Sequence, residues 1–125
     1  MRLSPSEIRF TQKTIKECFE DGKNVNDVIN DVQCNRLPTN KLPHIKVFSL
    51  NSKYYTLDDR HLYVFRVLQQ RFFLYEIPVD VVVNYGTEDV STENDGVSVE
   101  FENGMETYKH AIENNSGPWI RPNTR

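Results

Sequence analysis

The sequence lacks the features that mark several broad classes of protein. Its 125 residues include only two cysteines, Cys18 and Cys34, and no Cys-x-x-Cys motif or mixed His/Cys cluster. A structural zinc site of the usual kind is therefore not expected. Both cysteines fall within helical apolar patterns, so we expect buried free thiols rather than a disulfide, and a reducing, cytosol-like environment.

Long apolar segments are also missing. No apolar run approaches the roughly 20 residues of a membrane-spanning helix, and the N-terminus lacks the basic-then-apolar pattern of a secretion signal. We therefore expect no membrane partner and a cytoplasmic or nuclear location, with secretion as an effector left open.

A basic excess, which proteins with uniform affinity for nucleic acid normally show, is absent as well. The net charge is −3. Contact with a nucleotide or a nucleic acid would have to come from a local cluster of Arg and Lys. The length is that of one ordinary domain, which we place at residues 1–113, followed by a C-terminal tail at 114–125.

The hydrophobic periodicity predicts an α+β fold. Period-two patterns predict strands within residues 3–11 and at 45–50, 53–57, 77–83 and 97–101, with Asn51-Ser52 as a hairpin turn. Helical patterns predict a brief helix that starts at the Thr14-Ile15-Lys16-Glu17 capping box and stops at Asp21-Gly22, a helix capped by Asn24, a long helix from Asp58 to about Gln70, and a weak helix at 105–112.

The densest group of chemically active side chains lies where the strand at 53–57 meets the long helix. Asp58 is placed to cap this helix, and Arg60 lies in its first turn, where free N–H groups and the dipole favour anions. Arg60 can hold a phosphate through two hydrogen bonds. Asp59 and His61 supply acid–base capacity near neutral pH. A helix cap followed by solvated charges is the alternative explanation.

The same helix carries a row of polar side chains. Asp59, Tyr63, Arg66 and Gln70 recur at helical spacing and predict a polar face. An ion pair between Asp59 and Arg66 on this face would give Asp59 a purely structural role.

Three segments of the chain together resemble the ParB/sulfiredoxin superfamily, and more narrowly its ParB-like nuclease branch. They are Pro43-His44-Ile45-Lys46-Val47, Tyr54 to Leu62, and Ile77-Pro78-Val79. The junction reads Gly-Glu-Arg-Arg in ParB proteins, Gly-Cys-His-Arg in sulfiredoxins and Leu-Asp-Asn-Arg-Arg-Leu in a toxin-associated branch. The last resembles residues 57–62 most closely. The resemblance covers about residues 3–101 and implies a compact fold, with a small mixed sheet and helices packed around it.

The resemblance also implies a phosphate pocket at this junction, since members of the superfamily bind CTP or ATP there, transfer phosphate, or act as DNases. By position, Asp58 replaces the family glycine, Asp59 stands where ParB has Glu, Arg60 matches the first Arg of the ParB pair, and His61 replaces the second. The missing junction cysteine excludes sulfiredoxin-type reduction. The lower positive charge implies Mg²⁺ or Mn²⁺ held between a phosphate and the carboxylates of Asp58 and Asp59. The chain lacks the helix-turn-helix region of ParB, so operator binding is not expected.

Two hypotheses remain open from the sequence. In the first, the chain is a nuclease or nucleotide hydrolase in which Asp59, Arg60 and His61 are catalytic. The phosphate is then held by Arg60 and by a polar group on the first strand, namely Arg9, Thr11, Gln12 and Lys13. In the second, the fold is retained without catalysis, as an effector-like module that binds a nucleotide or a protein partner. Neither the substrate nor the oligomeric state follows from the sequence.

Overall fold

A two-residue turn organises the centre of the sheet. Strands β4 (Ile45–Leu50) and β5 (Lys53–Thr56) pair antiparallel on either side of Asn51 and Ser52. These two residues have positive φ values of 54° and 67°, as a hairpin turn that matches the twist of its strands requires. The predicted hairpin is therefore confirmed.

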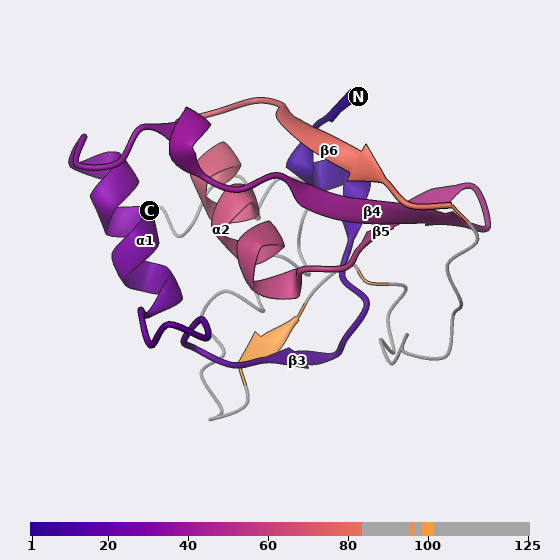
Figure 1. Cartoon of the computed structure of the whole chain (residues 1–125), viewed down its shortest axis with the longest axis horizontal. Coiled ribbons are helices and arrows are strands. Elements are labelled where there is room, and N and C mark those ends of the chain that lie inside the picture. The colour runs from indigo at the N-terminus through magenta and orange to yellow at the C-terminus, as the bar shows by residue number, and fades with distance from the viewer. Residues whose placement is uncertain (84–95, 97–98, 102–125) are drawn as a thin grey trace.

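The remaining strands extend this hairpin into a curled five-stranded sheet of order β1-β6-β4-β5-β2 (Figure 1). Strand β6 (Ile77–Val81) lies parallel to β4, and β1 (Arg2–Leu3) pairs antiparallel with β6. At the opposite edge, β2 (Ile8–Arg9) runs parallel to β5. The computed structural model describes residues 1–83, 96 and 99–101, and this part of the chain is a mixed α+β domain.

Two helices pack beside each other (Figure 1) and share a hydrophobic core with the sheet. Helix α1 (Val25–Gln33) is capped by Asn24, and α2 (Asp59–Gln70) is capped by Asp58, both as predicted. Alternate residues of β4 and β6 face the helices and share one hydrophobic core with them. This core includes Ile45, Val47, Ile77 and Val79 from the strands, Val25, Val28, Ile29 and Val32 from α1, and Leu62, Val64, Phe65 and Leu68 from α2.

The brief helix predicted from Thr14 to Gly22 is wrong. Thr14 and Ile15 form strand β3 (Thr14–Ile15), which pairs in parallel with β7 (Glu100–Phe101). The chain then turns back, with the amide of Gly22 bonded to the carbonyl of Phe19. A helix this short is costly to nucleate, and the pairing of Ile15 with Phe101 is a contact that a local capping pattern cannot anticipate.

Two other local predictions need correction. The strand predicted within residues 3–11 is interrupted. Leu3 belongs to β1 and Ile8–Arg9 to β2, while residues Pro5–Glu7 between them form a short 3-10 helix, η1, with its own Ser4–Glu7 capping box. Both cysteines are free, as predicted, but they are exposed rather than buried.

Several predictions lie outside the described residues. They are the turns at 85–95 and 103–104, the weak helix at 105–112, the tail at 114–125, and the start of the strand at 97–101. Within residues 1–83, 96 and 99–101, no helix has the length and apolar character that a membrane span demands.

The face of α2 that was predicted to be polar is buried. Arg66 and Gln70 are each 1% exposed. The Arg66 guanidinium donates to the carbonyl oxygens of Pro5, at 3.3 Å, and Ile8, at 2.6 Å. The Cζ atom of this guanidinium lies 5.2 Å from the centre of the Phe10 ring. This face therefore anchors the N-terminal segment, and the polar residues on it serve packing rather than solvation.

The turn geometry yields a stability prediction. Ser52→Gly should raise the free energy of unfolding by about 0.5–1 kcal/mol, because glycine adopts positive φ without steric cost and Asn-Gly is a preferred turn pair. Ser49→Gly, an exposed position inside β4, is the matched control and should lower stability by a similar amount. Urea unfolding measures both changes, and a loss of stability in Ser52→Gly would contradict the assigned turn.

Candidate functional site

The candidate site forms where β5 ends and α2 begins. The hydroxyl oxygen of Thr56 accepts a hydrogen bond from the Asp58 amide at 2.8 Å. Asp58 in turn caps α2, and its Oδ1 accepts from the His61 amide at 3.1 Å. These two bonds turn the chain sharply from strand to helix. They place Asp58, Asp59, Arg60 and His61 in consecutive positions around the first turn of α2.

Asp58 and His61 form a hydrogen-bonded pair. Asp58 Oδ2 lies 2.7 Å from His61 Nδ1. Burial by itself would raise the Asp58 pKa, but the hydrogen bond to His61 and the charge on that ring outweigh it and lower the pKa below its usual value. The His61 ring also stacks on the Phe19 ring, with 4.3 Å between the ring centres. Because Nδ1 is held by the carboxylate, Nε2 is the nitrogen that a ligand would meet.

Asp59 points away from this pair. Its two oxygens accept hydrogen bonds from the backbone amide and the hydroxyl of Thr11, each at 2.9 Å. Burial is the main cause that raises its pKa to about 6, with a smaller contribution from the charge of Asp58, while the bonds from Thr11 and Gln12 oppose the shift. Asp59 is thus a largely buried carboxyl group that titrates close to neutral pH.

Arg60 connects α2 to the segment that was predicted as a helix. Its guanidinium donates to the carbonyl oxygen of Cys18 and lies over the Phe19 ring, 5.8 Å from its centre. A guanidinium has five N–H donors, so this single bond leaves Arg60 with the capacity to bind a ligand.

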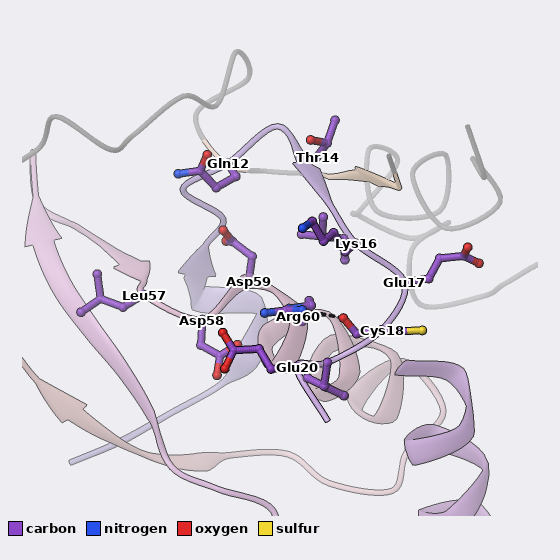
Figure 2. Close-up of a pocket in the computed structure, with 12 residues that line it drawn as sticks. Gln12, Thr14, Lys16, Glu17, Cys18, Glu20, Leu57, Asp58, Asp59 and Arg60 are labelled. Atoms are coloured by element: carbon purple, nitrogen blue, oxygen red, sulfur yellow. Dashed lines mark hydrogen bonds between the residues drawn. The ribbon is translucent and has the colours of Figure 1, made fainter. Parts of the chain in front are cut away.

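A groove opens between this segment and the start of α2. We call it the α2 groove. It has a volume of about 770 Å³. Figure 2 shows Asp59 pointing toward the segment that carries Gln12, while Arg60 reaches the Cys18 carbonyl. The charged lining residues are Lys16, Glu17, Glu20, Asp58, Asp59 and Arg60. Four acidic and two basic groups make the lining more acidic than a simple phosphate cradle.

A second groove of about 580 Å³, the side groove, lies next to the first. It is bounded by α1, by the loop around the 3-10 turn η2 (Thr39–Lys41) and by the start of α2. His61 lines only the side groove and Asp59 only the α2 groove, whereas Asp58 and Arg60 line both.

The structure separates the predicted phosphate-binding residues. Gln12 and Arg60 line the α2 groove, and Thr11 is buried beneath it in its bonds to Asp59. Arg9 and Lys13 are not among the residues that line either groove. Arg9 pairs beside Tyr55 in the sheet, and its Cβ lies close to Gly96.

Sequence reasoning missed the opposite wall of the α2 groove. This wall is built by residues 14–20, including the Cys18 carbonyl and the Phe19 ring. These residues were missed because the sequence predicts a helix in this segment. The ring contact of Phe19 with Arg60 and His61 depends on how the segment folds back, and no local sequence pattern encodes it.

The predicted metal ligands do not form a ready cation site. All four carboxylate oxygens of Asp58 and Asp59 accept hydrogen bonds, from His61 on one side and from Thr11 on the other. No third ligand joins them, since the described residues contain no group of three or more His, Cys, Asp or Glu able to hold a metal. A bridging Mg²⁺ or Mn²⁺ would have to share these oxygens with their hydrogen-bond donors, using the remaining lone pairs, and the metal stays a prediction.

Comparison with known proteins adds no assignment. No family model, curated protein or solved structure matches this chain. The resemblance to the ParB-like branch therefore stays a prediction that rests on the residues of the junction.

The buried Asp59 makes a prediction about pH. Its folded pKa of about 6 lies above the ordinary value of 3.8, so protonation stabilises the folded state below about pH 4, and this contribution is lost as the pH rises through 6. Relative to the wild type, Asp59→Asn should gain on the order of 2 kcal/mol of stability between pH 4 and pH 7.

Urea unfolding at a series of pH values measures this difference. Asp27→Asn, an exposed position on α1, is the control and should leave the pH dependence of stability unchanged. A constant difference between Asp59→Asn and the wild type across this range would contradict the buried, hydrogen-bonded position of Asp59.

Proposed function

We propose that the chain is a ParB-like domain that binds a phosphate group at Arg60 and hydrolyses a phosphoester or phosphoanhydride there. The observation that carries the proposal is the placement of three groups around the junction of the two grooves. Arg60 lines both grooves, Asp59 lines one, and His61, held by Asp58, lines the other. The proposed base, Asp59, and the proposed acid, His61, thus lie in different grooves, and the anion-binding Arg60 lies between them.

This order suits an in-line displacement. Phosphoryl transfer needs the attacking and leaving oxygens on opposite sides of the phosphorus and a cation that binds the oxygens between them. Water attacks phosphorus from the α2 groove and gives its proton to Asp59. The ester P–O bond breaks, and the leaving oxygen takes a proton from His61 Nε2 in the side groove. Proton exchange with solvent then restores both residues.

The electrostatics support these roles. Asp59, with a pKa of about 6, is mostly ionised at pH 7 yet basic enough to accept a proton, which is the range in which general bases work well. The Asp58 carboxylate is hydrogen-bonded to Nδ1 of His61 and fixes the orientation of the ring, so that Nε2 is left for the substrate. In this assignment Asp58 positions His61 and does not touch the substrate.

Substitutions at the junction test the proposal. With a panel of nucleotides including ATP and CTP, DNA, RNA and aryl phosphates as substrates, Arg60→Ala should lower kcat/KM about 10²–10³-fold through lost charge stabilisation. His61→Asn should lower kcat about 10²–10⁴-fold through lost proton transfer. His44→Asn, an exposed histidine at the start of β4, is the matched control and should leave turnover unchanged.

Asp58→Asn separates positioning from folding. Asparagine caps a helix as well as aspartate, so α2 should remain intact. Without the carboxylate that holds Nδ1, the His61 ring loses its fixed orientation, so kcat should fall while α2 stays folded. Assays with Mg²⁺, with Mn²⁺ and with EDTA show whether turnover depends on a metal. Absence of turnover on every substrate, with or without metal, would rule out the enzyme.

A second candidate function is a binding module without catalysis. The acidic lining of the α2 groove supports it, because Glu17, Glu20, Asp58 and Asp59 outnumber Lys16 and Arg60 and favour a basic protein segment over a phosphate. Such a module would bind Lys- or Arg-rich peptides more weakly after Glu17→Gln and Glu20→Gln, and would turn over no phosphoester. Tighter phosphate binding by these two variants would instead support the phosphate site.

A further inference from the structure

The side groove has an apolar floor that the proposed chemistry does not use. Six apolar residues line it, contributed by the segment before α1, by α1, by the chain around η2 and by the residue that precedes the Asp58 cap of α2. They are Phe19, Val28, Leu37, Leu42, Pro43 and Leu57. A concave site with apolar walls and a few polar groups is the usual form of a pocket for an organic ligand.

The charges around this floor are balanced. Lys23, Lys41 and Arg60 face Glu20, Asp21 and Asp58. Four of these groups already have partners. Lys23 forms an ion pair with Asp31, and Asp21 accepts a hydrogen bond from the Lys23 amide. Arg60 donates to the Cys18 carbonyl, and Asp58 binds His61. The side groove is therefore less acidic than the α2 groove and opposes an anionic ligand less strongly.

The two grooves adjoin at Arg60, which lines both of them. Five lining residues belong to both, namely Phe19, Glu20, Leu57, Asp58 and Arg60. An ester whose phosphate rests on Arg60 can therefore place its organic group in the side groove, which Leu37, Pro43 and Leu57 line. The Phe19 and His61 rings, whose centres lie 4.3 Å apart, both line the side groove, and aromatic side chains favour contact with a planar group.

From these shared residues we propose that the side groove binds the organic part of the phosphate ester, and that this part is a planar, apolar group. The inference rests on the proposed function, because it takes the phosphate to lie at Arg60. It adds the specificity of the site: esters with a small aliphatic group should bind more weakly than aryl esters. The volume of about 580 Å³ admits a two-ring group.

A series of ligands with the same charge tests the inference. The dissociation constants of methyl phosphate, phenyl phosphate and 2-naphthyl phosphate are measured by calorimetry, and that of the neutral probe 2-naphthol by ligand-observed NMR. We expect 2-naphthyl phosphate to bind about tenfold tighter than methyl phosphate or better, because its rings leave water for the apolar floor. We also expect 2-naphthol to bind without any phosphate.

Variants locate the effect in the side groove. Leu37→Asn should reduce the naphthyl preference several-fold and leave methyl phosphate binding unchanged. Leu50→Asn, a half-buried leucine that does not line the side groove, is the matched control. Pro43→Asn repeats the test at an exposed position that lines the side groove, where a substitution does not disturb the core. Pro38→Asn, at an exposed proline outside the groove, is its control.

The outcomes separate the two proposals. Equal binding of methyl and naphthyl phosphates, or a naphthyl preference that survives both Leu37→Asn and Pro43→Asn, overturns the side-groove inference while the phosphate site stands. If no phosphate binds but 2-naphthol binds and is lost in both variants, the proposed function fails and the groove remains a site for planar apolar groups. If neither phosphates nor 2-naphthol bind, both proposals fail.

Discussion

The candidate site depends on the hydrogen bonds that the buried Arg66 makes to the N-terminal segment. Its guanidinium is 1% exposed and binds the carbonyl oxygens of Pro5 and Ile8. Burial, together with the nearby charge of Arg9, lowers its pKa to about 9, so it stays protonated at pH 7. An arginine in this position replaces lost hydration with carbonyl oxygens and with the Phe10 ring. It thereby holds residues 5–10 against α2 and brings Thr11 within reach of Asp59.

This anchoring explains why four adjacent residues have four different environments. Thr11 draws Asp59 into a buried bond, while Asp58 turns to cap the helix and to hold His61. Arg60 reaches across to the Cys18 carbonyl and defines the boundary between the two grooves. Two carboxylates next to each other in sequence therefore acquire opposite pKa shifts, Asp58 downward and Asp59 upward. When the pKa values of two neighbouring carboxyl groups are shifted in opposite directions, the two groups can take different parts in acid–base chemistry.

The parts of the fold that local patterns determine could be read from the sequence. The Asn51-Ser52 hairpin and the helices capped by Asn24 and Asp58 follow from turn chemistry, capping and apolar periodicity. The β3–β7 pair could not be read in this way, because Ile15 acquires its strand partner Phe101 from the other end of the chain. The buried face of α2 was missed for a related reason. Arg66 and Gln70 look solvent-exposed until the N-terminal segment covers them. The grouping of Asp58, Asp59, Arg60 and His61 at the start of α2 could be read from the sequence, but the groove wall around Phe19 could not.

The central claim is that Arg60, Asp59 and His61 surround a phosphoryl group. Orthovanadate tests this claim most directly, because bound vanadate adopts the trigonal-bipyramidal geometry of phosphoryl transfer. The protein labelled with ¹⁵N is titrated with vanadate and followed through its backbone amides, the guanidinium of Arg60 and the ring nitrogens of His61. The account predicts saturable shifts at Arg60 and at His61 Nε2, and at the amides of residues 58–61, all lost in Arg60→Ala. Saturable shifts confined to other surfaces, or no shifts at vanadate concentrations well above those that bind phosphoryl-transfer enzymes, would contradict it.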